Sequence, residues 1–533
     1  MTSRKALPLT TILAAAVWLA LTVALVLSVT AGGDPAALVF CAASALLWVS
    51  GWRAAALWVR SAGRRRVGGA LPDDRPQSGA ELRVALLYCV ADDADLTAMT
   101  ISMRQDVAVD AVILDDSKDQ RSRDLIDAFA AAHGCQVIRR AERTGFKAGN
   151  LNHGVAVLQG RYDAYVICDS DVVLPPHFVR VGAHALADPS VAVAQGLPDA
   201  SGGRTWFARY FGPLLATHVG VTRRGREAHG IVAFLGRGAV VRASAIDEVG
   251  GFPIAVAEDL ALTTALRRHG WRLVNVDVSF REDYPVDYRS FRTQARKTAE
   301  GAVEFLRHPR RLRGLPRWER FDALLEASLV PLTALAGVTA LMSGSALASR
   351  GTAPPLWAIM ATALSALAPL LPEAVKRVRT QKLAAGMAFI ALGGALYASS
   401  MFVILGAVLR TLAGGRAVFW ITPKTAQQLG LRQALMHLRP ELVLAPPLIV
   451  ATVLVSGGPL SAAGLLWPLL ASVAFFLPAL RVTRQARTWE DVVRRRPRLA
   501  ILRRAGTRLL YRPSGGRIWK SPAMSPLANP TDS

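Results

Sequence analysis

Two pairs of aspartates each follow an apolar segment that has the composition of a buried strand. Asp169 and Asp171 end one such segment, and Asp115 and Asp116 end another. Paired carboxylates suit Mg²⁺ and Mn²⁺, which prefer oxygen ligands and usually share their coordination with substrate phosphates. Asp-x-Asp also occurs by chance in many loops, and adjacent aspartates equally suit an ordinary turn or helix cap. The pairs predict metal and phosphate chemistry only if the fold brings them together.

Four further residues and one glycine turn could bind or activate a substrate. Lys147 and Asn150 place a cation and an amide at the start of an expected helix, where a phosphate can bind. Glu258 and Asp259 directly precede another expected helix, 260–268, and a carboxylate at a helix N-terminus has a lowered pKa and can take a proton from a hydroxyl group. Gly236 lies in a Gly-Arg-Gly turn, where the backbone can approach a substrate closely. Each pattern taken alone also fits a plain cap, a surface lysine or a simple turn.

The segment that must position these residues alternates strand and helix. Apolar runs of strand length and runs of helical spacing follow one another in the order strand 82–89, helix 96–105, strand 108–114, helix 124–133, strand 136–139, helix 149–158 and strand 164–168. This order predicts a mostly parallel α/β sheet that is covered on both faces. Ligands of such sheets bind beyond the carboxyl ends of the strands. Both aspartate pairs are expected at that edge.

The composition requires a membrane part as well. The chain has 533 residues, of which 52% are hydrophobic and only 19% are charged, and this is too apolar for a soluble protein. A span needs about 20 apolar residues, and charge-free runs predict spans at 7–30, 36–52, 327–349 and 351–372, and two within 442–480. We therefore expect two N-terminal spans, a linker, an α/β domain, a second helical bundle and a basic tail, at residues 1–60, 61–80, 81–310, 311–480 and 481–533.

The net charge of +24 lies mostly in the loops next to the expected spans and in the tail. Such a distribution is typical of basic loops that face the cytoplasm, and no nucleic-acid-binding motif competes with that interpretation. If the apolar run 383–409 also crossed the membrane, the basic loop after it and the tail would lie outside the cell. We therefore predict six spans and one interfacial helix at about 383–410, with the α/β domain in the cytoplasm.

In their order along the chain, these motifs resemble the family 2 inverting glycosyltransferases of the membrane-bound subgroup that contains the cellulose, chitin and hyaluronan synthases. The matching sequences are DDS at 115–117, KAGNLN at 147–152, DSD at 169–171, LGRGAVVR at 235–242 and AED at 257–259. The resemblance covers roughly residues 80–310. It implies an α/β GT-A fold for the cytoplasmic domain, inserted in the helical bundle, and a nucleotide-sugar donor that is usually UDP-linked.

The resemblance also implies a role for each matching residue. Mg²⁺ or Mn²⁺ is expected on Asp169 and Asp171, and Asp259 is expected to act as the general base beside Glu258. Tyr88 is expected to stack on the nucleotide base. The other residues expected to contact the donor are Asp115, Asp116, Lys147, Asn150 and Asp169. The residues expected near the acceptor sugar are Gly236, Gln294 and Lys297.

Two motifs disagree about whether the transfer repeats. The synthases carry Gln-x-x-Arg-Trp on an interfacial helix; here Gln294 is kept, but Lys297 and Thr298 replace the arginine and the tryptophan, and a threonine cannot stack on a sugar. By contrast, the segment 412–430 resembles the gating loop of bacterial cellulose synthases, whose Phe-x-Val-Thr-x-Lys motif is matched by Phe419, Thr422 and Lys424. The alternative interpretation of this segment is an ordinary basic loop.

We therefore expect an inverting hexosyltransferase of the plasma membrane that extends a β-glycan and exports it through its own bundle. The alternatives are a non-processive transferase that modifies a lipid or a short acceptor, and an inactive scaffold or a transporter. The expected partners are a nucleotide sugar, a glycan or lipid-linked acceptor and the lipid bilayer, with room for an accessory export protein and with no nucleic acid.

Overall fold

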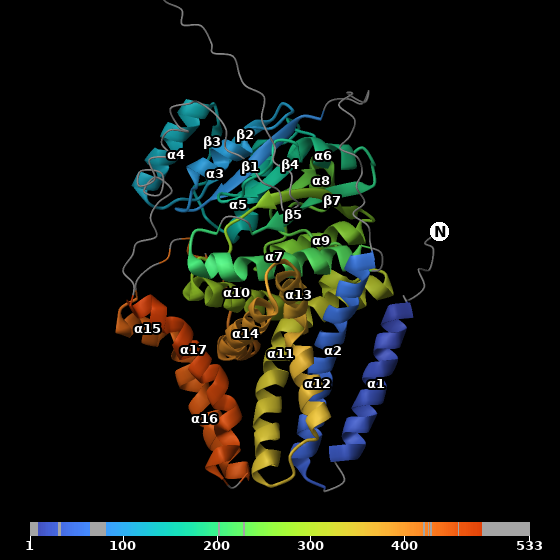
Figure 1. Cartoon of the computed structure of the whole chain (residues 1–533). Coiled ribbons are helices and arrows are strands. Elements are labelled where there is room, and N and C mark those ends of the chain that lie inside the picture. The colour runs from blue at the N-terminus through green and yellow to red at the C-terminus, as the bar shows by residue number, and fades with distance from the viewer. Residues whose placement is uncertain are drawn as a thin grey trace, which may run out of the picture.

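In the computed structural model, an α/β domain stands on a bundle of long helices (Figure 1). Helices come first along the chain, then the α/β domain, and then helices again. The structure describes residues 9–29, 33–63, 82–200, 203–227, 230–418, 420, 422–424, 426, 429–456 and 458–481. Most of the expected linker and nearly all of the basic tail lie outside these residues.

Seven strands form one mixed sheet in the spatial order β3-β2-β1-β4-β6-β5-β7. Neighbouring strands are parallel except around β6, which runs antiparallel to both β4 and β5. The strands are β1 (Val84–Val90), β2 (Asp110–Asp115), β3 (Gln136–Ile138), β4 (Ala164–Asp169), β5 (Val191–Asp199), β6 (Ala239–Arg242) and β7 (Arg272–Arg281). The predicted mostly parallel α/β class is confirmed, and the reversed strand β6 is an addition to the prediction.

Helices cover both faces of the sheet. Successive residues of a strand point to opposite sides, so each strand contributes side chains to both faces. In β1, Leu87 packs into the core beneath α5, α8 and α9, whereas Leu86 packs into the core beneath α3, α4 and α6. Both cores are apolar, so the sheet is buried on its two faces. The helices are α3 (Leu96–Ser102), α4 (Gln120–His133), α5 (Phe146–Val157), α6 (Phe178–Ala185), α8 (Ala243–Glu248) and α9 (Glu258–Arg268).

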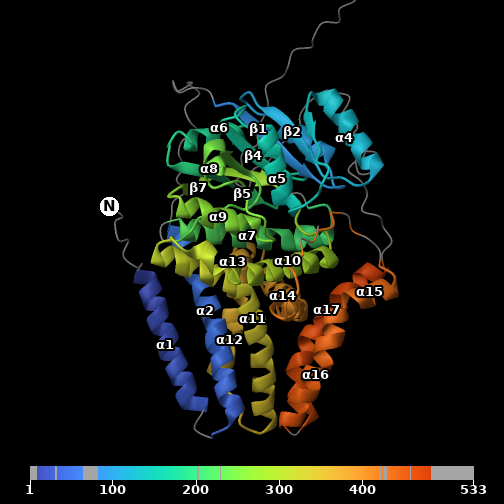
Figure 2. The ribbon, with the colours of Figure 1, turned by 180° about the vertical axis from the view of Figure 1, so that it is seen from behind.

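Two helices join the α/β domain to the bundle. α7 (Trp206–Arg226) and α10 (Tyr288–Leu306) lie across the top of the bundle, between it and the sheet (Figures 1 and 2). On α10, Arg292 is buried and donates through Nη2 to Glu441 Oε2 at 2.9 Å. Arg377, which follows the expected span 351–372, donates to the carbonyl oxygen of Tyr210 on α7 at 2.7 Å. These buried polar contacts fix the α/β domain against the bundle.

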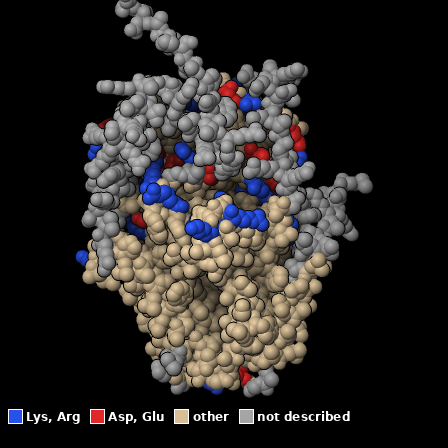
Figure 3. Space-filling model, in the orientation of Figure 1, with Lys and Arg blue, Asp and Glu red and all other residues tan. Residues whose placement is uncertain are grey.

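The bundle has the composition of a membrane part. Figure 3 shows a lower half almost free of charged side chains on this face, below a band of basic side chains. Of the described helices, five are long and apolar enough to cross a membrane: Pro35–Ala62, Arg317–Ser349, Leu356–Thr380, Leu383–Leu412 and Arg439–Ser456. The helices of the bundle are α1 (Leu9–Val29), α2 (Pro35–Gly63), α11 (Arg317–Ser349), α12 (Leu356–Leu367), α13 (Leu371–Thr380), α14 (Leu383–Leu412), α15 (Leu431–His437), α16 (Arg439–Ser456) and α17 (Ala463–Arg481).

One apolar helix differs from the others in direction. α14 is seen nearly along its axis in both Figure 1 and Figure 2, whereas α1, α2, α11 and α12 run down the picture. Its length and composition alone would allow it to cross a membrane. A helix that lies across the others favours the interfacial interpretation of 383–410, which stays a prediction.

Candidate active site

The ends of β1, β2 and β4 bring the two aspartate pairs to one edge of the sheet. β1 lies between the other two strands, and its register pairs Val90 with Asp115 on one side and Cys89 with Asp169 on the other. The two acidic strand ends are therefore separated by the width of a single strand. Parallel strands of this kind present their carboxyl ends to a shared ligand-binding crevice.

Asp115 and Asp116 are each held by an arginine. Arg139 donates through Nε to Asp115 Oδ2 at 2.7 Å, and Arg140 donates to both oxygens of Asp116, at 2.9 Å through Nε and 2.7 Å through Nη2. Burial opposes ionisation of Asp115, but the hydrogen bonds from Ser117 and Arg139 outweigh it and keep the pKa of this carboxyl below its ordinary value. Asp115 is therefore fixed and charged, and Asp116 is fixed in place by Arg140.

Asp169 accepts from the lysine at the start of α5. Lys147 Nζ lies 2.5 Å from Asp169 Oδ1 and 2.8 Å from the carbonyl oxygen of Gly236. On the other side, Arg237 Nε lies 3.8 Å from Asp169 Oδ2. Burial opposes ionisation of Asp169, but these two cations, with Lys424 beyond them, hold its pKa well below the ordinary value.

Asp171 faces a second lysine, which comes from the segment 412–430. Lys424 Nζ lies 3.1 Å from Asp171 Oδ1, 2.8 Å from Asp93 Oδ2 and 2.7 Å from the hydroxyl oxygen of Ser170. Burial disfavours the charge of Lys424, but Asp171 and Asp93 outweigh it and raise the pKa of the lysine above its ordinary value. Three oxygen atoms thus surround one cation at the end of β4.

The glycine turn before β6 is the point where the motifs meet. Gly236 has a φ of +78°, a conformation that favours glycine. A Cβ atom on Gly236 would lie 3.7 Å from Glu258 Oε1 and 3.9 Å from Asp259 Cβ. The same atom would lie 4.0 Å from Lys147 Nζ. Residues from α5, α9 and the turn therefore converge on one spot beside Asp169.

Glu258 differs from the expectation for a carboxylate at a helix start. Its side chain is buried, and burial together with the neighbouring charge of Asp259 raises its pKa, against the lowering effect of Lys297 and Lys147. The helix terminus does not outweigh these effects, so the predicted lowering was wrong for Glu258. Burial also lowers the pKa of Lys297 on α10, although Glu258 lies close enough to oppose it.

A family model described as glycosyl transferase family group 2 matches residues 165–411. The match begins in β4, includes the Asp-x-Asp sequence and Asp259, and continues through α10 and α11 into α14. The central part of this chain is thus similar to the family 2 glycosyltransferases.

Curated relatives of this chain include glycan-forming enzymes of bacteria and plants. The chain is 32% identical over 151 residues to glucans biosynthesis glucosyltransferase H of Xylella fastidiosa, covering 25% of this chain and 23% of that protein. It is 26% identical over 206 residues to a probable glucomannan 4-beta-mannosyltransferase of Arabidopsis thaliana, covering 37% and 46%. It is 32% identical over 167 residues to a putative cellulose synthase of Komagataeibacter xylinus, covering 30% and 10%. The chain thus matches less than half of each relative's length.

Among solved structures, the chain is similar to a mannosyltransferase from Pyrobaculum calidifontis whose complex holds GDP-Man and Mn2+. The sequence identity is 18% and the TM-score is 0.48, and the similarity covers 71% of this chain and 97% of that one.

A buried glutamate ties the segment after α14 to α10. Glu300 on α10 is fully buried and accepts from Val418 N at 3.1 Å and from Trp420 Nε1 at 3.3 Å. It also accepts from Arg296 at 2.8 Å and lies 2.6 Å from Arg410 Nη2. The guanidinium of Arg296 lies over the ring of Trp420 at 4.4 Å. These contacts, and a bond from Ser290 Oγ to the carbonyl oxygen of Pro423, hold the segment on α10.

The structure does not bring every predicted site residue to this edge. Tyr88 is fully buried in the core beneath α3, where its hydroxyl lies 3.4 Å from the carbonyl oxygen of Met99, so the ring is not placed to stack on a base. Asn150 is buried and donates to the carbonyl oxygen of Leu114, so it supports the end of β2. Thr298 is exposed on α10. Phe419 lies outside the described residues.

Several residues of the candidate site were not predicted from the sequence. Arg139 was placed at the end of a strand, and Arg140, Asp93 and Glu300 were assigned no role. Glu282, which holds Arg237 through a bond of 2.9 Å from Nη2, did carry a signal. It belongs to an acidic pair that directly follows β7 at the same edge of the sheet, the pattern that pointed to Asp169.

Proposed function

We propose that the α/β domain transfers a hexosyl group, with inversion, from a nucleotide sugar to a hydroxyl group of a growing β-glycan. The convergence at Gly236 carries this proposal. There, an ionised carboxylate at the end of β4, a lysine and a carboxylate pair at the start of α9 lie around one glycine turn. A diphosphate leaving group and an acceptor hydroxyl are what such a set of charges can serve together.

Asp169 and Asp171 are the proposed metal ligands, and the chemistry around them fits a divalent cation. Asp93, Ser170 and Asp171 already surround one ammonium group with hard oxygen atoms, which are the donors that Mg²⁺ and Mn²⁺ prefer. Among the described residues, no three His, Cys, Asp or Glu side chains are grouped closely enough to hold an ion by themselves. This suits an ion that shares its coordination with a substrate diphosphate, whose developing charge it would stabilise.

Asp259 is the proposed general base. It begins α9 beside Gly236, and its Oδ1 accepts from the backbone N–H of Leu260 at 2.7 Å, which orients the carboxylate. Glu258 is the weaker candidate, because burial favours its protonated form. A base at this position would take the proton of the acceptor hydroxyl as that oxygen attacks the sugar.

The remaining charges have proposed roles on either side of the reacting sugar. Asp115 and Asp116, fixed by their arginines, would bind the nucleoside, with Asn150 supporting the strand end behind them. Lys147 and Lys424 would neutralise the departing diphosphate. Gly236, with Gln294 and Lys297 of α10, would contact the acceptor.

A processive reaction is the first candidate, because the segment that carries Thr422 and Lys424 reaches the acidic edge of the sheet, as a gating loop must. Transfer of a single sugar to a lipid or short glycan is the second, and the exposed Thr298 favours it, because α10 has no aromatic platform at that position. In the processive case the bundle would export the glycan from a cytoplasmic active site across the plasma membrane, with an accessory protein as a further partner.

The experiment for the proposed function is transfer from a panel of radiolabelled nucleotide sugars by the purified full chain in lipid nanodiscs, with sizing of the products. We expect label in a glycan from a UDP-linked hexose, only with Mg²⁺ or Mn²⁺ present. Long products support processive synthesis, and a single added residue supports the second candidate. Donor binding without transfer to any acceptor would favour an inactive scaffold.

A further inference from the structure

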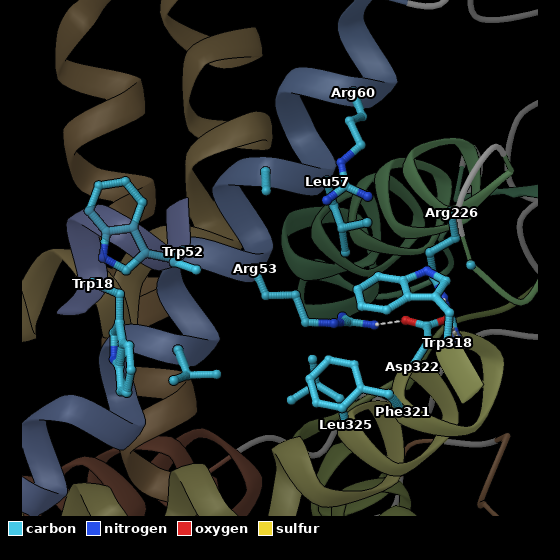
Figure 4. Close-up of a pocket in the computed structure, with 14 residues that line it drawn as sticks. Trp18, Trp52, Arg53, Leu57, Arg60, Arg226, Trp318, Phe321, Asp322 and Leu325 are labelled. Atoms are coloured by element: carbon cyan, nitrogen blue, oxygen red, sulfur yellow. Dashed lines mark hydrogen bonds and ion pairs between the residues drawn. The ribbon is translucent and has the colours of Figure 1, made fainter. Parts of the chain in front are cut away.

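A cavity of about 200 Å³ lies where α1, α2, α7 and α11 meet, and it shares no lining residue with the proposed active site. Trp18 and Trp52 stand on one side, and Trp318 and Phe321 on the other (Figure 4). Arg60 points into the space from α2. The lining is mostly apolar, so the cavity would not suit a small soluble anion.

The polar part of the cavity carries more positive than negative charge. Arg226 donates to Asp322 Oδ2 at 2.9 Å through Nε and at 2.6 Å through Nη2. Arg53 reaches across to Asp322 Oδ1 at 3.5 Å (Figure 4) and lies 2.5 Å from Glu326 Oε2. The field of Asp322 also reaches Arg60. Three guanidinium groups thus share two carboxylates, and an anion between them would be stabilised.

The position of the cavity adds to this chemistry. It lies at the junction of the apolar bundle and the charged domain, where tryptophan rings and arginines together are typical of a bilayer interface. Phe321 is 52% exposed, so the apolar wall continues to the outer surface of α11. Basic pockets between membrane helices on this side bind the head groups of anionic lipids.

We propose that this cavity binds one anionic phospholipid, with its phosphate between Arg53 and Arg60 and the start of an acyl chain against Trp18 and Trp52. The excess of guanidinium groups selects an anionic over a zwitterionic head group. The apolar walls require a ligand with a hydrocarbon part, which distinguishes a phospholipid from free phosphate.

The site is connected to the turn that holds Gly236. Asp322 Oδ2, which binds Arg226, also accepts from the backbone N–H of Ile231 at 2.9 Å, and residues 231–235 lead directly into the glycine turn. A bound phosphate that draws Arg53 away from Asp322 would alter the anchor of this segment. Bound lipid would therefore influence transfer, a consequence that rests on the proposed function.

The test is native mass spectrometry of the full chain released from nanodiscs of mixed phosphatidylglycerol and phosphatidylcholine. We expect each protein molecule to retain one phosphatidylglycerol in preference to phosphatidylcholine. Arg60→Gln should lower that preference about fivefold, the effect of about 1 kcal/mol for one arginine near an anionic lipid. Arg379→Gln, which removes an exposed arginine of α13 instead, should leave it unchanged.

Ala56→Phe provides a second variant, because it fills part of the cavity and removes no charge. It should reduce retention of either lipid, and a melting temperature equal to that of the wild type shows that it folds. Equal retention of both lipids by the wild type would overturn the proposal, as would an unchanged preference in Arg60→Gln. Preferred retention of a polyprenyl phosphate over phosphatidylglycerol would also overturn it and indicate a lipid-linked acceptor instead. Because lipid retention is measured without donor, these results do not depend on transfer.

Discussion

At the scale of single residues, each carboxylate of the Asp-x-Asp sequence is neutralised by the ammonium group of a lysine. Lys147 binds Asp169, and Lys424 binds Asp171. A second cation that approaches either carboxylate is repelled by the lysine that already binds it. A divalent ion held by Asp171 would therefore have to displace Lys424, and the lysine would then be free to bind the diphosphate.

Lys424→Ala should therefore bind Mn²⁺ more tightly than the wild type when no nucleotide is present. We expect a gain of about tenfold, because a hydrogen bond between charged groups contributes about 1.5 kcal/mol or more. Electron paramagnetic resonance of free Mn²⁺ measures this directly, and Lys376→Ala, an exposed lysine of α13, is the control. A weaker or equal affinity in Lys424→Ala would contradict displacement of the lysine by the metal.

Residue-level prediction from sequence succeeded where position in the chain determines position in space. The ends of β2 and β4 were placed correctly at one edge, because parallel strands share their direction. The prediction that Tyr88 stacks on the nucleotide base was wrong. Both faces of the sheet are apolar, so the pattern of residues along β1 does not show which face Tyr88 lies on. The predicted lowering of the pKa of Glu258 was wrong because burial raises that pKa, and burial cannot be read from the sequence.

At the scale of elements, α10 connects the active site to the segment after α14. Glu300 gathers four donors from this neighbourhood, and burial opposes its ionisation, but Arg296, Val418 N and Arg410 keep its pKa below the ordinary value. The glutamate is therefore charged at neutral pH and acts as the anchor of the segment that carries Lys424. Neither the glutamate nor its donors form a sequence pattern, since they come from three separate stretches of the chain.

Glu300→Gln should loosen this anchor and raise the donor KM about tenfold. Its arginine partners would lose the buried carboxylate that accepts their hydrogen bonds. Glu304→Gln is the matched control, four residues along α10, where the carboxylate accepts from Val256 N instead. Quenching of Trp420 fluorescence should also change in Glu300→Gln only. If both variants affected the donor KM alike, the anchor would have no specific role.

At the scale of the whole molecule, the apolar runs correctly indicated helices, but length and composition do not determine their direction. α14 meets every criterion for a span and yet lies across the other helices. In the sequence, only the positions of the basic loops indicate that this helix is interfacial. The direction itself depends on packing against α10, α13 and α17.

A topology reporter fused at Gly414, directly after α14, should report the cytoplasmic side. A reporter at Gly351, between α11 and α12, should report the opposite side and serves as the internal control. If the two fusions gave the same side, the arrangement of six spans and one interfacial helix would be wrong. Accessibility of single cysteines at these positions to a membrane-impermeant reagent provides the measurement without a fusion.

The most direct test of the whole account is the effect of Asp259→Asn on transfer and on donor binding, measured on the same preparation. Loss of a general base should lower kcat by at least about a hundredfold, while the affinity for the metal-bound nucleotide sugar stays within about twofold, since Asp259 does not hold the donor in this account. Asp247→Asn, an exposed acid of α8, should leave both unchanged. Undiminished turnover by Asp259→Asn would contradict the proposed mechanism.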